Sequence, residues 1–200
     1  MLRSQAIFYV VLWLGYTTVL GQVDADPDGI GLYVDPGGLE NSISVAPWTL
    51  FDAYLVITNP TESGVHAWCA GLGFDDGVFI HSWEYMGSPD TFNAASAPGE
   101  YQWFAGSQTS NEIGSGNVVP VLRVTMLVSD PEAKSVRVTG SPLYCFEAPT
   151  YRNWDSYHLG EPVFLTPASG SIVDPSFRIN GEAPVGLCGG RLGDLKRLYR

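Results

Sequence analysis

The sequence VVPVLRVTMLVS, residues 118–129, is the longest candidate strand in the chain and decides the class of fold. Apolar and polar side chains alternate along it. Leu122, Val124 and Met126 fall on one side, and Arg123 falls on the other. Alternation with a period of two is typical of a β-strand that buries one face. The stretch therefore predicts a sheet that covers a hydrophobic core with one of its faces.

Shorter stretches of the same kind lie on both sides of it, and helical periodicity is nearly absent before the last ten residues. Gly, Pro, Asn and Asp separate these stretches. Asp75-Asp76-Gly77 is a hairpin signature between two of them. Residues 86–117 are too long for a structureless loop, so we expect a hidden strand near residues 100–104. The other predicted strands are residues 29–34, 50–58, 65–74, 78–85, 135–139, 163–165 and 176–179.

One-sided burial in so many short strands predicts an all-β protein, built as a two-sheet antiparallel sandwich. The chain has 200 residues, which is enough for one domain with a substantial core. The residues expected to meet between the sheets are Leu55, Ile57, Leu72, Phe74, Leu122, Val124 and Met126.

The start of the chain has the layout of a secretory signal peptide, which we assign to residues 1–21. A basic beginning is followed by an apolar run over residues 6–20 and a small residue at the cut. A cut after Ala25 and an uncleaved anchor are the alternatives. We assign the sandwich domain to residues 22–186. A Gly-rich break and a short basic tail occupy residues 187–200.

The chain is acidic, with a formal net charge of −11 at pH 7, and removal of the signal with its one arginine leaves −12. No basic patch is present to neutralise phosphates. We therefore exclude nucleic acid as a partner, and we expect no membrane insertion after signal cleavage. The predicted location is extracellular, on the cell surface or periplasmic.

Three cysteines, Cys69, Cys145 and Cys188, allow three disulfide pairings. An exported protein meets oxidising conditions in which a disulfide persists. We favour the pair Cys69–Cys145, because both lie within the predicted globular body and Cys188 lies in the tail. The alternative is that all three thiols are reduced and packed.

Three segments resemble parts of a cohesin-type sandwich. Residues 53–60 (AYLVITNP) and 64–75 (GVHAWCAGLGFD) are similar to two adjacent strands of that family. Residues 119–128 (VPVLRVTMLV) are similar to the strand that follows its long middle excursion. Over residues 50–140 the resemblance implies a cohesin-like arrangement of the two sheets, with a jelly roll as the other arrangement.

The chain is also similar to exported bacterial β-sandwich proteins of similar size that have no established activity. Those proteins begin, after the signal, with a segment like residues 26–35 (DPDGIGLYVD), and they carry Ile-Asn-Gly near the end, like residues 179–181. Their tail is similar to residues 192–200, although Leu192 stands where they usually have Trp. This resemblance implies a fold and a location, and it implies no chemistry.

An acidic segment near the predicted cleavage point is the one candidate metal site. Residues 24–29 (DADPDG) have the D-x-D-x-D-G form of a calcium loop, and Asp35 falls at the twelfth position. Pro27 and the lack of flanking helices favour a solvated arm instead. The candidate calcium ligands are Asp24, Asp26, Asp28 and Asp35.

No nucleophile elbow, zinc spacing or phosphate-binding glycine loop is present in the sequence, so we expect a protein that is not an enzyme. Aromatic residues outside the core pattern are the remaining signal, because flat exposed rings stack on sugars. We favour the alternative that these rings fill the ends of the sandwich. The candidate carbohydrate-binding residues are Tyr101, Trp103, Trp154 and Tyr157.

We therefore expect a secreted, non-catalytic β-sandwich that acts as an extracellular adhesion, matrix or scaffold module. Its partner would be an extracellular protein. The alternative is a carbohydrate-binding module whose partner is a polysaccharide. A row of exposed aromatic rings on one face would favour the carbohydrate, and a flat apolar patch without such a row would favour a protein.

Overall fold

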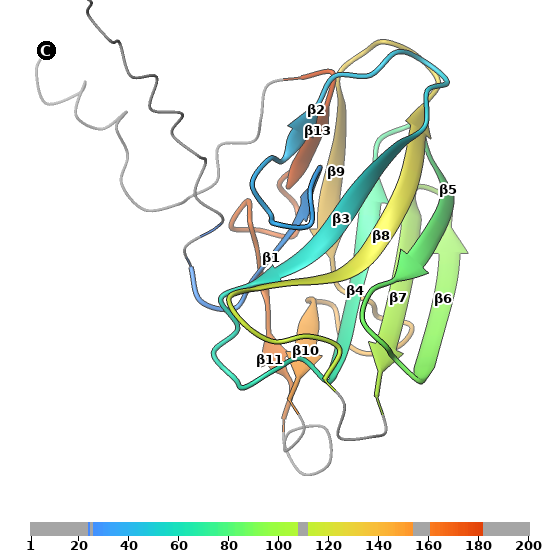
Figure 1. The fold of residues 1–200 in the computed structure, drawn as a ribbon. Helices are drawn as coiled ribbons and strands as arrows, with labels where there is room; N and C mark the ends of the chain where they lie inside the picture. Colours follow the sequence, from blue (N-terminus) through green and yellow to red (C-terminus); the bar gives the residue numbers. More distant parts are fainter. Residues whose placement is uncertain (1–23, 25, 108–111, 154–160, 182–200) are drawn as a thin grey trace, which may run out of the picture.

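The computed structural model describes residues 24, 26–107, 112–153 and 161–181. Its strands form two sheets that face each other, as Figure 1 shows. The front sheet has the strand order β12-β1-β3-β8-β5. The back sheet runs β11-β10-β4-β9-β13-β2, and β7 joins it on β4, with β6 paired to β7.

The longest strand is β8, which lies between β3 and β5 in the front sheet. The front sheet comprises β1 (Gly29–Tyr33), β3 (Phe51–Thr58), β5 (Val78–Tyr85), β8 (Val118–Val128) and β12 (Thr166–Pro167). The back sheet comprises β2 (Ser42–Ile43), β4 (Ala67–Phe74), β6 (Thr91–Ala97), β7 (Glu100–Gly106), β9 (Lys134–Thr139), β10 (Thr150–Arg152), β11 (Val163–Phe164) and β13 (Phe177–Ile179).

The core lies between the two sheets and contains the side chains that the alternation predicted. Leu122, Val124 and Met126 have no exposed area. Arg123 on the same strand is half-buried on the outer face. Of the predicted core residues, Phe74 alone keeps partial exposure, because it lies at the edge of the sandwich. The prediction of an all-β, two-sheet sandwich is confirmed. The other predicted core residues with no exposed area are Leu55, Ile57 and Leu72.

The hairpin predicted at Asp75-Asp76-Gly77 is wrong, because this turn passes from the back sheet to the front sheet. β4 pairs with β7, β9 and β10, whereas β5 pairs with β8. Asp75 is held instead by the start of β9: the Ser135 N–H donates to its Oδ2 at 2.9 Å. The same turn residues suit a hairpin and a crossing between sheets, so the local sequence does not separate the two.

The sheets differ from the prediction in two respects: two pairs of strands are parallel, and one strand was not predicted. β1 pairs with β12, and β2 pairs with β13, in parallel. β6, which the alternation did not reveal, forms a regular antiparallel ladder with β7. The side chains of β6 are exposed or half-buried on both faces, so they carry no alternation to read.

A disulfide joins Cys69 on β4 to Cys145, with the two Cα atoms 6.4 Å apart. It attaches the loop of residues 140–149 to the outer face of the back sheet. Gln102 adds a second attachment, because its Oε1 accepts hydrogen bonds from the Leu143 N–H at 3.1 Å and from the Ser141 hydroxyl at 3.3 Å. Together these contacts lay the loop across the small residues of β4.

Several predicted segments lie outside the described residues. These are the signal peptide at residues 1–21 and the tail at residues 187–200. Within the part of the chain that the structure describes, no helix is long and apolar enough to cross a membrane.

Candidate functional site

Of the four predicted sugar-binding residues, the structure describes Tyr101 and Trp103, and these two do not form an exposed platform. Trp103 is wrong as a candidate, because its ring has no exposed area. Residues of β7 alternate between the two faces of the back sheet, and Trp103 falls on the core side. Tyr101, on the same side, is half-buried and stacks on Trp103 with the ring centroids 5.6 Å apart. Trp154 and Tyr157 lie outside the described residues.

The four predicted calcium ligands are not brought together, so the predicted calcium loop is wrong as a single site. Asp35 closes its own turn, where its Oδ1 accepts from the Gly37 N–H at 2.8 Å. Asp28 accepts the Tyr151 hydroxyl at 2.8 Å, and Asp24 accepts the Asp26 N–H at 3.1 Å. Across the described residues, no three His, Cys, Asp or Glu side chains are grouped so that they could hold a metal ion.

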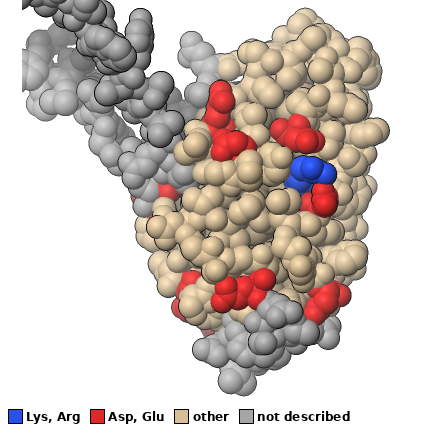
Figure 2. Space-filling view, in the orientation of Figure 1, with Lys and Arg blue, Asp and Glu red and all other residues tan. Residues whose placement is uncertain are grey.

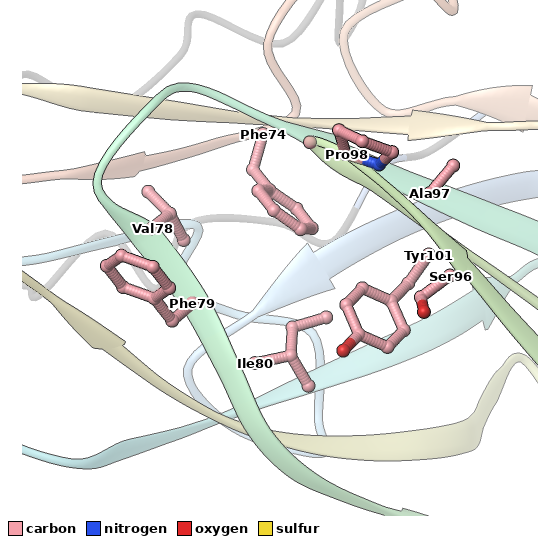
Figure 3. Close-up of a pocket in the computed structure, with 9 residues that line it drawn as sticks. Phe74, Val78, Phe79, Ile80, Ser96, Ala97, Pro98 and Tyr101 are labelled. Carbon is pink, nitrogen blue, oxygen red and sulfur yellow. The ribbon is translucent and has the colours of Figure 1, made fainter.

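A cavity of about 350 Å³ opens at the edge of the sandwich, between β5 and the turn that joins β6 to β7 (Figure 3). Most of the residues that line it are aromatic or aliphatic and come from both sheets, and the Tyr101 phenol is the one ionisable side chain among these lining residues. The cavity therefore lacks the convergent polar groups of a catalytic site. Its lining residues are Phe74, Val78, Phe79, Ile80, Ser96, Ala97, Pro98, Gly99 and Tyr101.

Trp48 lies in a turn where glycine is the usual residue. The Thr49 N–H donates to the Ala46 carbonyl oxygen at 3.2 Å, Pro47 follows Ala46, and the φ of Trp48 is 61°. This is the pattern of a type II turn, whose third residue needs a positive φ. Holding a non-glycine residue there costs about 1–3 kcal/mol. The other described non-glycine residues with positive φ are Asp or Asn, which tolerate it better.

The ring of Trp48 is held against the outer face of the front sheet. Its backbone N–H donates to the Val128 carbonyl at 2.7 Å. Its indole stacks on Phe79, with ring centroids 6.4 Å apart and 17° between the planes. Phe79 lies opposite Leu127 in the β5–β8 ladder. Trp48 is nevertheless 68% exposed and Phe79 is 48% exposed, so both rings face solvent.

Leu50 extends this apolar surface onto β3. Leu50 directly precedes Phe51, which pairs with Met126, so the same register continued by one residue brings Leu50 opposite Leu127. Phe51 faces the core, whereas Leu50 is 50% exposed. We define the Trp48 patch as Trp48, Leu50, Phe79 and Leu127.

Acidic groups predominate on the face of the molecule that Figure 2 shows. Arg123 on the outer face of β8 is paired with Glu84 on β5. Asp52 accepts the Thr125 hydroxyl at 2.7 Å. These charged groups are engaged with their neighbours, and the Trp48 patch itself contains no charged residue. Apolar contact is therefore what this surface offers a partner.

The sequence carries a signal for the turn at Trp48 but none for its role. Pro47 predicts a turn in principle, because proline favours the second position of one. No local pattern shows that a tryptophan would take the glycine position or that its ring would remain exposed. The stacking partner, Phe79, comes from a strand about thirty residues away and is found only in the folded chain.

Comparison with known proteins shows what this fold is similar to. No model of a protein family matches the chain, and no curated protein matches it. Cohesin modules are among the solved structures that are similar to this chain. The sixth cohesin of scaffoldin B from Acetivibrio cellulolyticus, solved with the Cel5 dockerin, gives a TM-score of 0.53 at 12% identity and covers 77% of this chain and 99% of that chain.

Two further cohesins agree with it. A type II cohesin domain from the Acetivibrio cellulolyticus cellulosome gives a TM-score of 0.55 at 10% identity, covering 78% of this chain and 96% of that chain. A cohesin module of a Clostridium perfringens family 33 glycoside hydrolase gives 0.53 at 13% identity, covering 77% and 97%. The cohesin-like resemblance is thus confirmed for the fold, which is a cohesin-type β-sandwich.

The half-buried phenol of Tyr85 on β5 should make the stability of the fold sensitive to high pH. Burial raises the pKa of Tyr85 to about 12, and the nearby Tyr144 adds to the shift. Its ring packs on Phe92 at 5.1 Å, and its hydroxyl donates to the Asn93 carbonyl at 2.7 Å. In the unfolded chain this phenol loses its proton near pH 10, whereas in the folded chain it keeps the proton until about pH 12. The contribution of the neutral Tyr85 phenol to the free energy of unfolding is therefore complete below pH 10 and is lost as the pH rises to about 12.

We expect the melting temperature to fall between pH 10 and pH 12, and to fall less steeply in Tyr85→Phe. Melts of both chains across this range measure the difference. Equal slopes in the two chains would show that the phenol of Tyr85 is not buried.

Proposed function

We propose that this chain is an exported, non-catalytic interaction module that binds a protein partner through the Trp48 patch. The observation that carries the proposal is the backbone of Trp48. Glycine would occupy this turn position without strain. The chain instead places a large ring there and leaves 68% of it exposed. Strained residues of this kind concentrate at functional sites, and the ring is the group that the strain presents.

The shape and chemistry of the patch support a protein as the partner. Trp48 and Phe79 are stacked on each other. Leu50 and Leu127 continue the surface with branched aliphatic side chains. The patch is therefore a mixed apolar surface and not a row of separate rings, and it has the large aromatic anchors that dominate protein interfaces. The acidic chain would repel a strongly acidic partner.

The fold supports the same proposal. Several of the similar solved structures are complexes of a cohesin with a dockerin. We extend from this only that a sandwich of this type serves well as a rigid platform for another protein.

Export is the second part of the proposal. The signal at residues 1–21 would direct the chain out of the cytoplasm, leaving the sandwich domain at residues 22–186 and the tail at 187–200. A disulfide between Cys69 and Cys145 suits an oxidising compartment. An extracellular scaffold or adhesion role on the cell surface fits both features.

Trp48→Gly separates binding from folding. Glycine relieves the strain at φ 61°, while the contact with Phe79 is lost. These changes oppose each other, so we expect the free energy of unfolding to change by less than about 1 kcal/mol. Urea denaturation of the mature chain measures this. A loss several times larger would mean that the indole serves the fold and not a partner.

Photocrosslinking tests the binding directly. A benzophenone amino acid replaces Phe79 in the mature chain, which is then mixed with the exported protein fraction of the source cells. Phe164 is the matched control, because it is 55% exposed and, among the residues that the structure describes, its ring contacts that of Phe146. We expect one discrete protein adduct from position 79, none from position 164, and loss of the adduct when Trp48→Gly is added.

Two outcomes would contradict the proposal. The first is equal adducts from positions 79 and 164, which would show unspecific contact. The second is retardation of the chain by a neutral glycan in affinity electrophoresis that Trp48→Gly abolishes. That result would replace the protein partner with a polysaccharide.

A further inference from the structure

The edges of the two sheets are blunted everywhere but at β6, among the strands that the structure describes. β2, β11 and β12 are two residues long. β5 is interrupted by a register shift between Ile80 and Ser82 and carries Glu84 on its outer face. Short, interrupted or charged edges protect a sheet from pairing with other chains.

β6 has none of these protections. It spans Thr91–Ala97 with the sequence TFNAASA, which contains no charged residue and no proline. It pairs with β7 over its whole length without a register shift. No described strand pairs with its other side. A regular, uncharged edge of seven residues is a template for adding another strand.

The hydrogen-bonding groups on this edge can be assigned from the neighbouring ladder. The Ser107 N–H donates to the His66 carbonyl on the β4 side. Bonding alternates along an antiparallel strand, so Gln102 and Phe104 direct their backbone groups toward β6. Their partners are Ala95 and Asn93. The N–H and C=O groups of the alternate residues, Phe92, Ala94 and Ser96, therefore point away from β7.

The same three residues face the core side of the back sheet, but at a place that the front sheet does not cover. Phe92, Ala94 and Ser96 lie opposite Ala105, Trp103 and Tyr101 in the β6–β7 ladder. Figure 1 shows β6 at the outer edge of the back sheet. Phe92 is consequently 58% exposed, although it contacts Tyr85.

We propose that β6 pairs with β6 of a second copy of this chain, antiparallel and centred on Ala94. In this register Ala94 meets Ala94 of the second copy, and Phe92 of each copy meets Ser96 of the other. Residues with outward-directed backbone groups thus meet each other, as an antiparallel ladder requires. The contact is closed and two-fold, so it stops at two copies.

Two properties of β6 make a second copy the occupant. β6 contains no charged residue, so two acidic copies that pair through it do not bring like charges together along the paired strands. Ser96 lines the cavity of about 350 Å³ beside Ile80 and Tyr101 (Figure 3). The register places the exposed Phe92 ring of each copy next to the cavity of the other. Each copy thereby supplies one ring and one opening, at positions related by symmetry about Ala94.

Light scattering on the mature chain tests the pairing. We expect the molar mass to double between about 1 μM and about 1 mM chain. Ala94→Pro should remain monomeric, because proline removes the outward N–H while the bonds from Ala95 to β7 are kept. Ala94→Val keeps the N–H and should still form dimers. Phe92→Ala should weaken dimerisation by about tenfold or more.

A cysteine crosslink tests the register without relying on a disruptive change. In a Cys188→Ser background, Ala94→Cys places two thiols across the two-fold axis, where paired Cα atoms lie about 5.5 Å apart, within disulfide range. Mild oxidation should yield a covalent dimer. Val173→Cys, at a residue 72% exposed and away from β6, should not.

Three results would overturn the pairing. One is a monomeric mass at every concentration. Another is a dimer that survives Ala94→Pro and is not crosslinked by Ala94→Cys. The third is a chain that stays monomeric and whose Ala94→Pro variant loses the photocrosslinked adduct formed at position 79. That result would show that β6 binds the partner protein and not a second copy of this chain. Trp48→Gly should leave the dimer intact, so failure here is distinguishable from failure of the proposed function.

Discussion

Trp103→Ala is expected to lower the free energy of unfolding by about 3–5 kcal/mol, because it removes a fully buried indole ring from the core. The ring has no exposed area and packs on Tyr101, with Trp83 edge-on at 6.2 Å. Alanine removes the buried surface and leaves a cavity that the two sheets cannot close. Urea denaturation followed by circular dichroism measures the loss.

Trp48→Gly is the matched control for Trp103→Ala, since it removes a ring of the same size that is 68% exposed. We expect the two variants to differ by at least about 2 kcal/mol. If Trp103→Ala were as stable as Trp48→Gly, Trp103 would lie at the surface and the predicted sugar platform would have to be reconsidered.

Removal of the disulfide is expected to have the second large effect. Cys69 and Cys145 are 76 residues apart in sequence. A crosslink of that span lowers the conformational entropy of the unfolded chain and so raises the free energy of unfolding by about 4 kcal/mol. The double variant Cys69→Ala, Cys145→Ala should lose stability of that order, and reduction of the wild-type chain should lower its melting temperature similarly. Calorimetry with and without a reductant measures both.

Cys188→Ser is the control for the disulfide, because it leaves the pair Cys69–Cys145 intact. We expect its melting temperature to match the wild type under oxidising conditions. The pairing would be wrong if reduction left the wild type unchanged, or if Cys188→Ser lost as much stability as the double variant.

The central strands could be predicted from the sequence because they lie between solvent and core. Arg123 faces solvent between Leu122 and Val124, which have no exposed area. The alternation of polar and apolar residues along the strand therefore indicates which side chains are buried. The hidden strand near residues 100–104 was predicted from loop length alone and is found as β7. These inferences need only one strand at a time.

The errors arise where a residue's role depends on a distant part of the chain. The turn at Asp75-Asp76-Gly77 was predicted as a hairpin, but strand pairing is decided by which sheet each strand joins. β6 was missed because neither of its faces is buried. The candidate site was missed for a similar reason, because the Trp48 ring stacks on Phe79 of β5 and the two residues come together only in the folded chain.

The sequence by itself determined that this is an all-β sandwich and which side chains fill it, because the alternation of apolar residues is a local record of burial. Only the tertiary structure decided which aromatic rings are exposed. Trp103 and Trp48 are both tryptophans, yet Trp103 lies in the core and Trp48 is 68% exposed. Exposure depends on what the opposite sheet covers, and the front sheet covers Trp103 but ends before β6 and lies beneath Trp48.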